Sequence, residues 1–325
     1  MPLGLRRGTV TAIVDRVDRL VRLEVDGVPC VAYPGLTGPV ALGDDVLVNA
    51  QARELGLGSG GFDVLHANLT RGLELPAEPS AHVMKLPYTP LQHAVRHAEE
   101  DDGELLTDLG GLPVVCCSLH SQVAPVCAAL AGLGVAYVQL SGGALPVPLS
   151  DTVRALKERG LVRVAVGAGE CFGGDVECVT VVSALLWAAR GHDVAVCAIG
   201  PGIVGTATSA GNGGLAAADA ANAASAFGGR PIVAPRVSGA DARDRHRGVS
   251  HHTRAVVKAS GAPVAWPAGW EAPAWLTAVR EVDTSGWREA CSGLPLSHMG
   301  RGPDDDPTFF EAAFAAGTLA RTYVA

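Results

Sequence analysis

The chain has 325 residues, a formal net charge of −8 and an apolar fraction of 48%, with only 5% aromatic residues. This length suits one large domain with a smaller one beside it, and the acidic balance argues against a general nucleic-acid-binding protein. The sequence has no apolar signal segment at its start and no run of about 18 uncharged apolar residues, so we expect no membrane partner. Eight cysteines, several inside apolar runs such as PVVCCSL, are typical of buried thiols and indicate a reducing cytoplasm.

Residues 1–55 have the pattern of a small all-β domain. Apolar and polar residues alternate in GTVTAIVDRV and in LVRLEVDGVPCVAY, and Asp26-Gly27 is a two-residue hairpin signal. Short antiparallel strands bury little surface alone, so we expect a small barrel or sandwich with a structural role.

Residues 56–110 are expected to connect the two domains. Within them TPLQHAVRHAEE predicts a helix, with Thr89 as its cap and Pro90 at its first position. His93 and His97 would then share one face, which we interpret as a solvated surface.

Residues 111–325 alternate strands with helices. The expected strands are near-continuous apolar runs, which is typical of strands buried on both faces of a parallel sheet. The expected helices cover residues 123–130, 151–159, 175–190 and 214–227, and Asp306-Pro307 is expected to begin a C-terminal helix that docks on the sheet. The pattern predicts an α/β fold: a doubly wound, mostly parallel, Rossmann-like sheet in three layers, beside the small N-terminal β-barrel-like domain.

Four tryptophans, at positions 266, 270, 275 and 287, fall close together amid prolines. They suit a binding surface, an irregular lid or an interface between copies of the chain, so a homo-oligomer is left open.

A basic stretch, RVSGADARDRHRGVSHHTRAVVK at residues 236–258, runs against the acidic balance of the chain. It holds three of the ten histidines and six basic side chains against two aspartates. Ser250 is expected to cap a helix whose start attracts anions. The candidate catalytic residues are His246, His251, His252 and Asp241, and the candidate anion ligands are Arg243, Arg245 and Arg247. Local ion pairs on a solvated turn are the alternative interpretation.

A divalent metal in this stretch is left open, although the ligand spacing argues against it. Two helical zinc ligands normally stand four residues apart, whereas His251 and His252 are adjacent and point about 100° apart on a helix. His246 would have to reach in from the preceding loop.

The loops after the expected strands are rich in glycine and small hydroxyl residues, which let backbone N–H groups approach an anion. Ligands of open α/β sheets bind at this edge. The further candidate ligand-binding residues are Ser118, His120, Ser141, Gly142, Gly143, Gly169, Gly173, Asp175, Gly202, Gly205 and Thr206. Either Asp241 or Asp175 is expected to orient a histidine or to hold a cation. GAGECFG misses the dinucleotide-binding glycine spacing by one residue, and the Walker lysine motif is lacking, so NAD and ATP bound at a P-loop are disfavoured.

The segments RVSGADARDRHRGVSHHT, GPGIVGTATSAGNGG, SGGALP and SHMGRGPDDDPTFFEAAFAAG resemble the DUF3866 family, a bacterial family whose function is uncharacterised. The resemblance covers nearly the whole chain and implies a shared fold and a shared site, but no reaction. Where the family commonly has Gly-Thr-Gly-Thr, this chain has Gly205-Thr206-Ala207-Thr208, which narrows backbone access at Ala207.

We therefore expect a cytoplasmic enzyme that acts on a small phosphate- or carboxylate-bearing metabolite by hydrolysis or group transfer. The alternative is a non-catalytic ligand-binding or sensor protein that uses the same loops.

Overall fold

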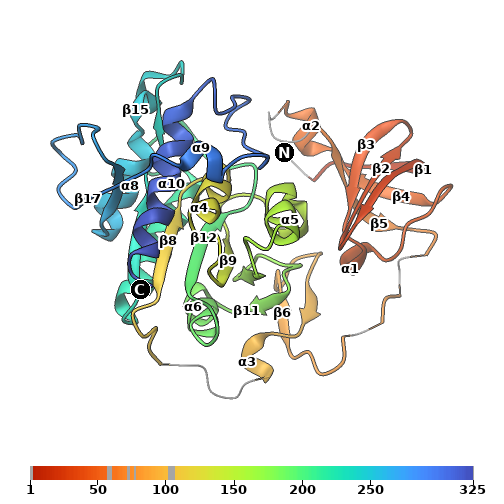
Figure 1. Ribbon diagram of the computed structural model, residues 1–325. Coiled ribbons are helices and arrows are strands. Elements are labelled where there is room, and N and C mark those ends of the chain that lie inside the picture. Colours follow the sequence, from red (N-terminus) through yellow and green to blue (C-terminus); the bar gives the residue numbers. More distant parts are fainter. Residues whose placement is uncertain (1–2, 57–60, 72–73, 77, 102–106, 325) are drawn as a thin grey trace. The chain divides into compact units, whose positions relative to one another are not determined.

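The computed structural model describes residues 3–56, 61–71, 74–76, 78–101 and 107–324. The chain divides into two compact units, Met1–Arg96 and His97–Ala325, whose elements are labelled in Figure 1.

The first unit contains a closed barrel with the strand order β1-β2-β3-β5-β4. Asp26 and Gly27 both adopt positive φ angles, of 52° and 76°, and join β2 to β3 as the hairpin signal predicts. Alternate apolar side chains, among them Leu23, Val46 and Val48, fill the barrel. The barrel extends past residue 55, because its last strand is β5. Its strands are β1 (Leu5–Val17), β2 (Leu20–Val25), β3 (Val28–Ala32), β4 (Asp45–Asn49) and β5 (Asp63–Asn68), and two short helices, α1 (Pro34–Thr37) and α2 (Gln51–Glu54), lie between them.

The prediction of a helix that begins at Thr89 is wrong. This segment instead contributes β7 (His93–Val95), which pairs antiparallel with β6 (Val83–Lys85), and only α3 (Ala98–Asp101) is helical. The Thr89 hydroxyl donates to the Leu86 carbonyl within a turn, and Pro90 suits that turn as well as a helix start. Strand pairing has overridden a local helical pattern, and the two histidines share no helix face.

The second unit is built on an eight-stranded sheet with the order β11-β10-β9-β12-β8-β13-β16-β17. Each neighbouring pair is parallel. The predicted doubly wound fold is therefore confirmed. The strands are β8 (Pro113–Cys117), β9 (Val135–Leu140), β10 (Val164–Ala168), β11 (Val176–Cys178), β12 (Val194–Ile199), β13 (Arg230–Ala234), β16 (Val264–Pro267) and β17 (Val279–Val282).

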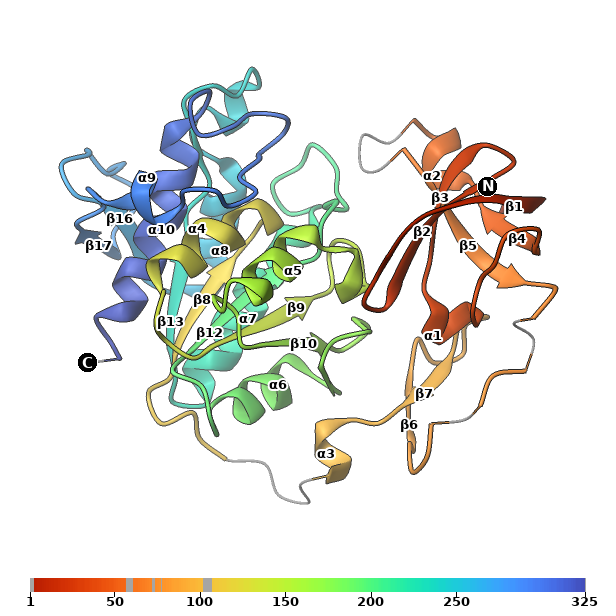
Figure 2. The same ribbon diagram turned by 45° about the vertical axis from the view of Figure 1, so that its right-hand side comes forward.

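Helices cover both faces of this sheet (Figure 2). The strand side chains alternate between the layers, so that Val115 and Cys117 of β8 enter one core while Val114 and Cys116 enter the other. One face carries α4 (Val123–Ala129), α5 (Asp151–Glu158), α9 (Trp287–Ala290) and the predicted C-terminal helix α10 (Pro307–Arg321), and the other carries α6 (Val181–Ala188), α7 (Ala216–Ala226) and α8 (His251–Ser260).

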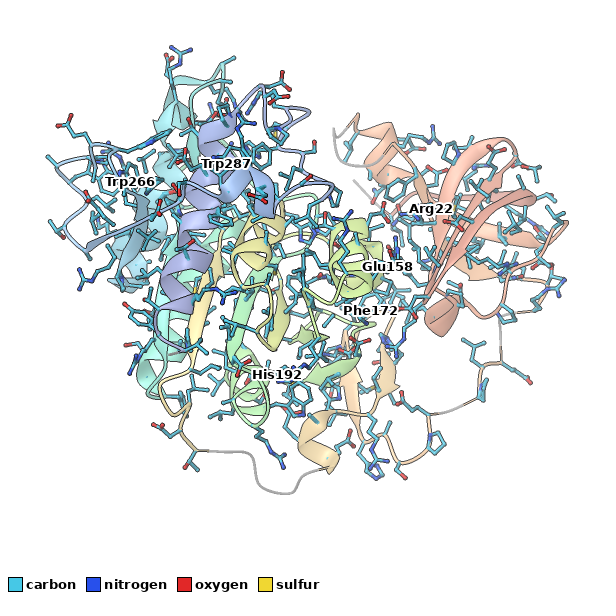
Figure 3. The ribbon with its side chains drawn as sticks, viewed as in Figure 1. Arg22, Glu158, Phe172, His192, Trp266 and Trp287 are labelled. Atoms are coloured by element: carbon cyan, nitrogen blue, oxygen red, sulfur yellow. The ribbon has the colours of Figure 1, made fainter. Side chains whose placement is uncertain are left out.

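Two further expectations are corrected by this unit. The helix predicted over residues 175–190 begins only at Val181, because the preceding residues form β11 at the sheet edge. Trp266 and Trp287, labelled in Figure 3, are near in sequence but are buried in the two cores on opposite faces of the sheet. None of the helices in the described ranges is both long and apolar enough to cross a membrane.

Candidate functional site

The carboxyl end of β8 is a switch point of the sheet. The helix after β8 packs on one face, whereas the helices that follow its neighbours β12 and β13 pack on the other. At such a point the loops diverge and leave room for a ligand. The loops that begin at Ser118, Gly200 and Arg236 start here.

The basic stretch folds into a small hairpin that leads into α8. The short strands β14 (Val237–Ser238) and β15 (Gly248–Val249) pair antiparallel, and a 3₁₀ turn, Asp244–His246, lies between them. The Ser250 side chain accepts a hydrogen bond of 3.2 Å from the His252 backbone N–H, which confirms the predicted N-cap of α8. This geometry brings the turn back beside the first residues of the helix.

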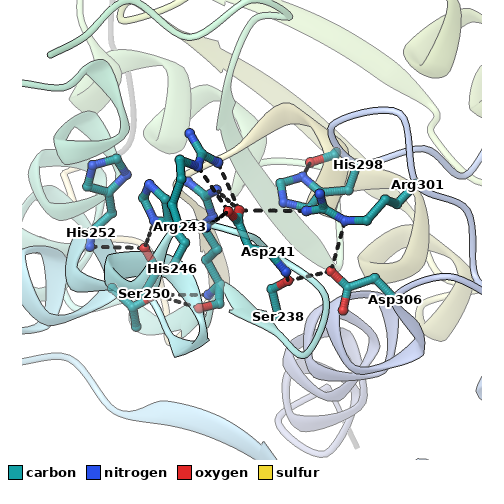
Figure 4. A network of polar contacts seen from close by, with 12 residues as sticks. Ser238, Asp241, Arg243, His246, Ser250, His252, His298, Arg301 and Asp306 are labelled. Atoms are coloured by element: carbon teal, nitrogen blue, oxygen red, sulfur yellow. Dashed lines mark hydrogen bonds and ion pairs between the residues drawn. The ribbon is translucent and has the colours of Figure 1, made fainter. Parts of the chain in front are cut away.

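Three imidazoles meet there, and we call His246, His251 and His252 the histidine cluster. Figure 4 shows His246 and His252 beside Ser250. The ring centroids of His251 and His252 are 4.3 Å apart with nearly parallel planes, and His246 stands edge-on at 5.0 Å from each. Their candidate ligand nitrogens all lie within 4.8 Å of one another. Ligand spacing along the sequence does not predict this arrangement, because the hairpin returns His246 to the helix start and side-chain rotation offsets the divergence along the helix.

The cluster contains buried nitrogen atoms that lack a protein partner. Among the described residues, Nε2 of His251 and both ring nitrogens of His252 are buried without a hydrogen bond. His246 is better supported, because its Nδ1 lies 2.8 Å from the Ser250 hydroxyl. Buried polar atoms are nearly always paired, so this grouping indicates a bound group or solvent.

The imidazoles of the cluster are neutral at pH 7. Burial, with help from Arg236 and Arg243, lowers the pKa of His246 to about 3. Burial, His251 and Arg236 lower the pKa of His252 to about 4. Burial and the charge of Arg245 also lower the pKa of His251. Neutral imidazoles offer lone pairs and do not act as general acids at this pH.

Asp241 lies beside the cluster but makes different contacts from those expected. Its side chain is only 3% exposed, and its carboxylate pairs with Arg236 at 3.3 Å, Arg243 at 2.8 Å and Arg301 at 3.6 Å. The hydrogen bonds from Arg243 hold the pKa of Asp241 well below its usual value. Asp241 therefore holds three arginines together, and Ser250, not Asp241, orients the His246 ring.

The C-terminal segment supplies residues that the sequence reasoning missed. Asp306 accepts hydrogen bonds from the Ser238 hydroxyl at 2.5 Å and the Gly239 backbone N–H at 3.0 Å, and lies 3.4 Å from Arg301. It occupies the N-cap position of α10, as predicted, but its side chain makes no capping bond there. His298 stacks on Phe309 and bonds to the Ser121 hydroxyl at 3.2 Å. The charge-rich ending SHMGRGPDDDP was the available signal, yet nothing local linked it to a loop some sixty residues earlier.

The three candidate anion-binding arginines differ in their surroundings. Arg243 already uses its guanidinium fork on Asp241. Arg247 is exposed and stands 3.7 Å from the exposed Asp244. Arg245 is exposed, has no ion pair with a described carboxylate, and is close enough to lower the pKa of His251. Among the described residues, Arg245 is therefore an exposed cation without an ion pair that acts on the cluster.

The glycine loops after β9 and β12 pack against each other. A Cβ on Gly142 would lie 2.4 Å from the Gly213 carbonyl oxygen, and one on Gly143 would lie 2.2 Å from that of Gly200. These glycines allow the backbones of the two loops to pack in direct contact. Ser141, Gly202, Gly205 and Thr206 are exposed, and the Thr206 hydroxyl bonds to Thr208 and to the Gly211 carbonyl.

His120 and Ser118 lie in the loop after β8 and are held by protein groups. Nδ1 of His120 lies 3.1 Å from the Ile199 carbonyl, which fixes the proton on Nδ1, and Nε2 lies 2.6 Å from the Ser150 hydroxyl. Ser118 is buried and bonds weakly to Gln122 at 3.5 Å. The Ser150 hydroxyl also caps α5 by accepting from Val153, and the side chain is buried. This serine and histidine therefore tie loops together.

Three candidates lie away from the cluster. Asp175 binds the Ala165 N–H and pairs with Lys157 at the amino ends of the strands, the opposite edge of the sheet. Gly169 and Gly173 follow β10, which is four places from β13 in the sheet, or about 19 Å at the usual strand spacing. Asp175 therefore orients no histidine of the cluster.

Fold and site together define a three-layer α/β protein with a histidine and arginine cluster at the switch point of its sheet. A family model described as "Protein of unknown function (DUF3866)" matches residues 29–317, and the chain belongs to this family. A search of curated proteins found no match.

Proposed function

We propose that the histidine cluster and the adjacent arginines form the active site of an enzyme that acts on a small phosphate- or carboxylate-bearing metabolite by hydrolysis or group transfer. The observation that carries this proposal is the grouping of three imidazoles beside the exposed Arg245, where several buried ring nitrogens and the guanidinium group have no partner among the described residues. Proteins seldom leave such atoms unpaired outside functional sites.

The charges favour an anionic substrate. Arg245 and Arg247 present guanidinium groups to solvent, and such groups bind phosphate and carboxylate oxygens through paired hydrogen bonds. Asp241 partly neutralises Arg236, Arg243 and Arg301, so the region keeps a positive excess. An anion that binds beside the cluster would complete this charge balance.

Hydrolysis or group transfer fits the imidazoles better than redox chemistry does. Each neutral imidazole has one unprotonated nitrogen, which can accept a proton from, or otherwise activate, an attacking hydroxyl or water molecule. The eight cysteines are free buried thiols, which supports a cytoplasmic setting.

The second candidate is a non-catalytic ligand-binding or sensor protein. The low pKa values of His246 and His252 favour it, because neither group exchanges protons readily near pH 7 without further activation. Substrate turnover distinguishes the two candidates, since both require an anion to bind.

The test uses inorganic phosphate as the probe, in calorimetric titrations of the full-length protein. We expect Arg245→Ala to weaken binding about tenfold, the loss of one charge-assisted hydrogen bond. Arg280→Ala, in an exposed arginine on β17, is the matched control and should leave affinity unchanged. Equal affinities for the two variants would overturn the assignment of the site. Turnover of a panel of phosphate and carboxylate esters, lost in Arg245→Ala, supports the enzyme, whereas binding without turnover supports the sensor.

A further inference from the structure

We infer that the histidine cluster is a divalent transition-metal site that takes Zn²⁺ through three imidazole nitrogens, with a fourth position open to water or to an anion. The inference concerns the same cluster as the proposed function, but it depends on the geometry of the imidazoles and not on any reaction.

The candidate ligand nitrogens of the cluster lie close enough together to share one ion. A tetrahedral Zn²⁺ with Zn–N bonds of about 2.0–2.1 Å holds its ligand nitrogens roughly 3.4 Å apart. The candidate nitrogens of His246, His251 and His252 lie within 4.8 Å of one another, so side-chain rotations that move each by about 1 Å close the site. The three rings already contact one another, with centroids 4.3–5.0 Å apart.

Several buried ring nitrogens of the cluster lack a hydrogen-bond partner among the described residues. Both ring nitrogens of His252, a side chain 7% exposed, are buried without a partner in the described structure, and so is Nε2 of His251. Neutral imidazole is the protonation state that binds a metal. An ion at the centre would satisfy one nitrogen of each ring at once, which no single neighbouring side chain does.

The His246 ring is held by Ser250 in the way that a metal-binding histidine is usually held. Nδ1 of His246 lies 2.8 Å from the Ser250 hydroxyl, so that Nε2 is free to face the metal. A metal-ligating histidine usually donates its other N–H to an oxygen atom in this way, which fixes the ring and raises its basicity. Ser250 is itself held by the helix start, because it accepts from the His252 N–H.

The surrounding charge selects the fourth ligand. Arg236 and Arg243 lie close enough to lower the pKa of the imidazoles, and Arg245 lies close to His251. These cations oppose a bare dication, and an anion on the open position offsets that repulsion. Zinc affinity should therefore rise when phosphate is present, and phosphate affinity should rise equally with zinc, because such coupling is reciprocal.

The test measures metal content and spectrum on the metal-stripped full-length protein. Equilibrium dialysis should give one Zn²⁺ per chain, and Co²⁺ should give the visible bands of a four-coordinate nitrogen and oxygen site without a sulfur charge-transfer band. His251→Ala, in the least buried member, should weaken zinc binding by more than about 100-fold, and Ser250→Ala by about 10-fold to 100-fold. His192→Ala, in a half-buried histidine after α6, is the matched control and should bind as the wild type does.

No bound zinc at one equivalent, binding that survives His251→Ala in a folded variant, or a cobalt–sulfur band would each overturn the inference. The Co²⁺ spectrum of the wild type keeps the test decisive if a variant fails to fold. Stoichiometric zinc without turnover leaves this inference standing and removes the proposed enzyme. Turnover by a protein that binds no zinc at one equivalent does the reverse.

Discussion

Replacing Asp241 by asparagine removes the negative charge that three arginines share. The Asp241 and Arg236 side chains are 3% and 4% exposed, whereas those of Arg301 and Arg243 are 22% and 38% exposed. Removing one partner of a buried ion pair costs about 3–5 kcal/mol, and partly exposed pairs add about 1 kcal/mol or less. Asp241→Asn should therefore lower the free energy of unfolding by about 3–5 kcal/mol, mainly because Arg236 is left charged and buried.

The assay is urea unfolding at pH 7, followed by circular dichroism, on metal-stripped protein. The matched control is Asp244→Asn, three residues away in the same loop, where the side chain is 95% exposed and lies 3.7 Å from Arg247. This control should show little or no change, because exposed ion pairs contribute little to stability. A loss for Asp241→Asn no larger than that of the control would refute the reasoning that Asp241 organises the site.

Three more predictions concern stability. Burial lowers the pKa of His120 to about 4 and that of His298 to about 3, so the unfolded chain takes up protons before the folded chain does as pH falls below about 6.5. Each histidine should then lower the free energy of unfolding by up to about 1.4 kcal/mol per pH unit, down to its folded pKa. Equal urea midpoints at pH 7 and pH 5 would contradict this prediction. Gly213→Ala places a Cβ 1.9 Å from the Gly142 carbonyl oxygen and should cost about 1–3 kcal/mol by calorimetry, whereas Gly191→Ala meets nothing within 4 Å and should not cost as much. Ser150→Ala removes the cap of α5 and the partner of His120, and should cost about 1–3 kcal/mol in the same measurement; an unchanged melting temperature would show that neither bond matters.

The sequence predicted elements whose cause is local. Asp26-Gly27 predicts its hairpin because both residues tolerate positive φ, and Ser250 predicts the start of α8 because its hydroxyl reaches a free N–H. Continuous apolar runs predicted the parallel strands, because a strand that is buried on both faces of a sheet needs apolar side chains on both faces.

The predictions that differed from the structure depended on distant partners. The segment after Thr89 has a helical pattern, but β6 offers it a strand to pair with. The glycine-rich sequence around Asp175 suggested that it belongs to the site. Its contacts with the Ala165 N–H and with Lys157 instead hold it at the opposite edge of the sheet. The contacts of Asp306 and Arg301 with Ser238 and Asp241 span more than fifty residues, which no local pattern reveals.

The histidine cluster was predicted in part. Residue type and spacing pointed to His246, His251 and His252 as members of a site, but helix geometry argued against a shared ligand. The geometry of a regular helix gives only the directions in which side chains leave the backbone. It describes neither the hairpin that brings His246 back to the helix start nor the distance that an imidazole ring spans from its Cα.

The central claim is that three neutral imidazoles at residues 246, 251 and 252 face one shared centre. Long-range ¹H–¹⁵N spectra of the imidazoles at pH 7, recorded before and after one equivalent of Zn²⁺ with phosphate, test it most directly. The account predicts that these three rings are neutral in the metal-free protein and shift together at one equivalent, while His192 stays unchanged. Charged rings at pH 7, or shifts confined to other histidines, would contradict it.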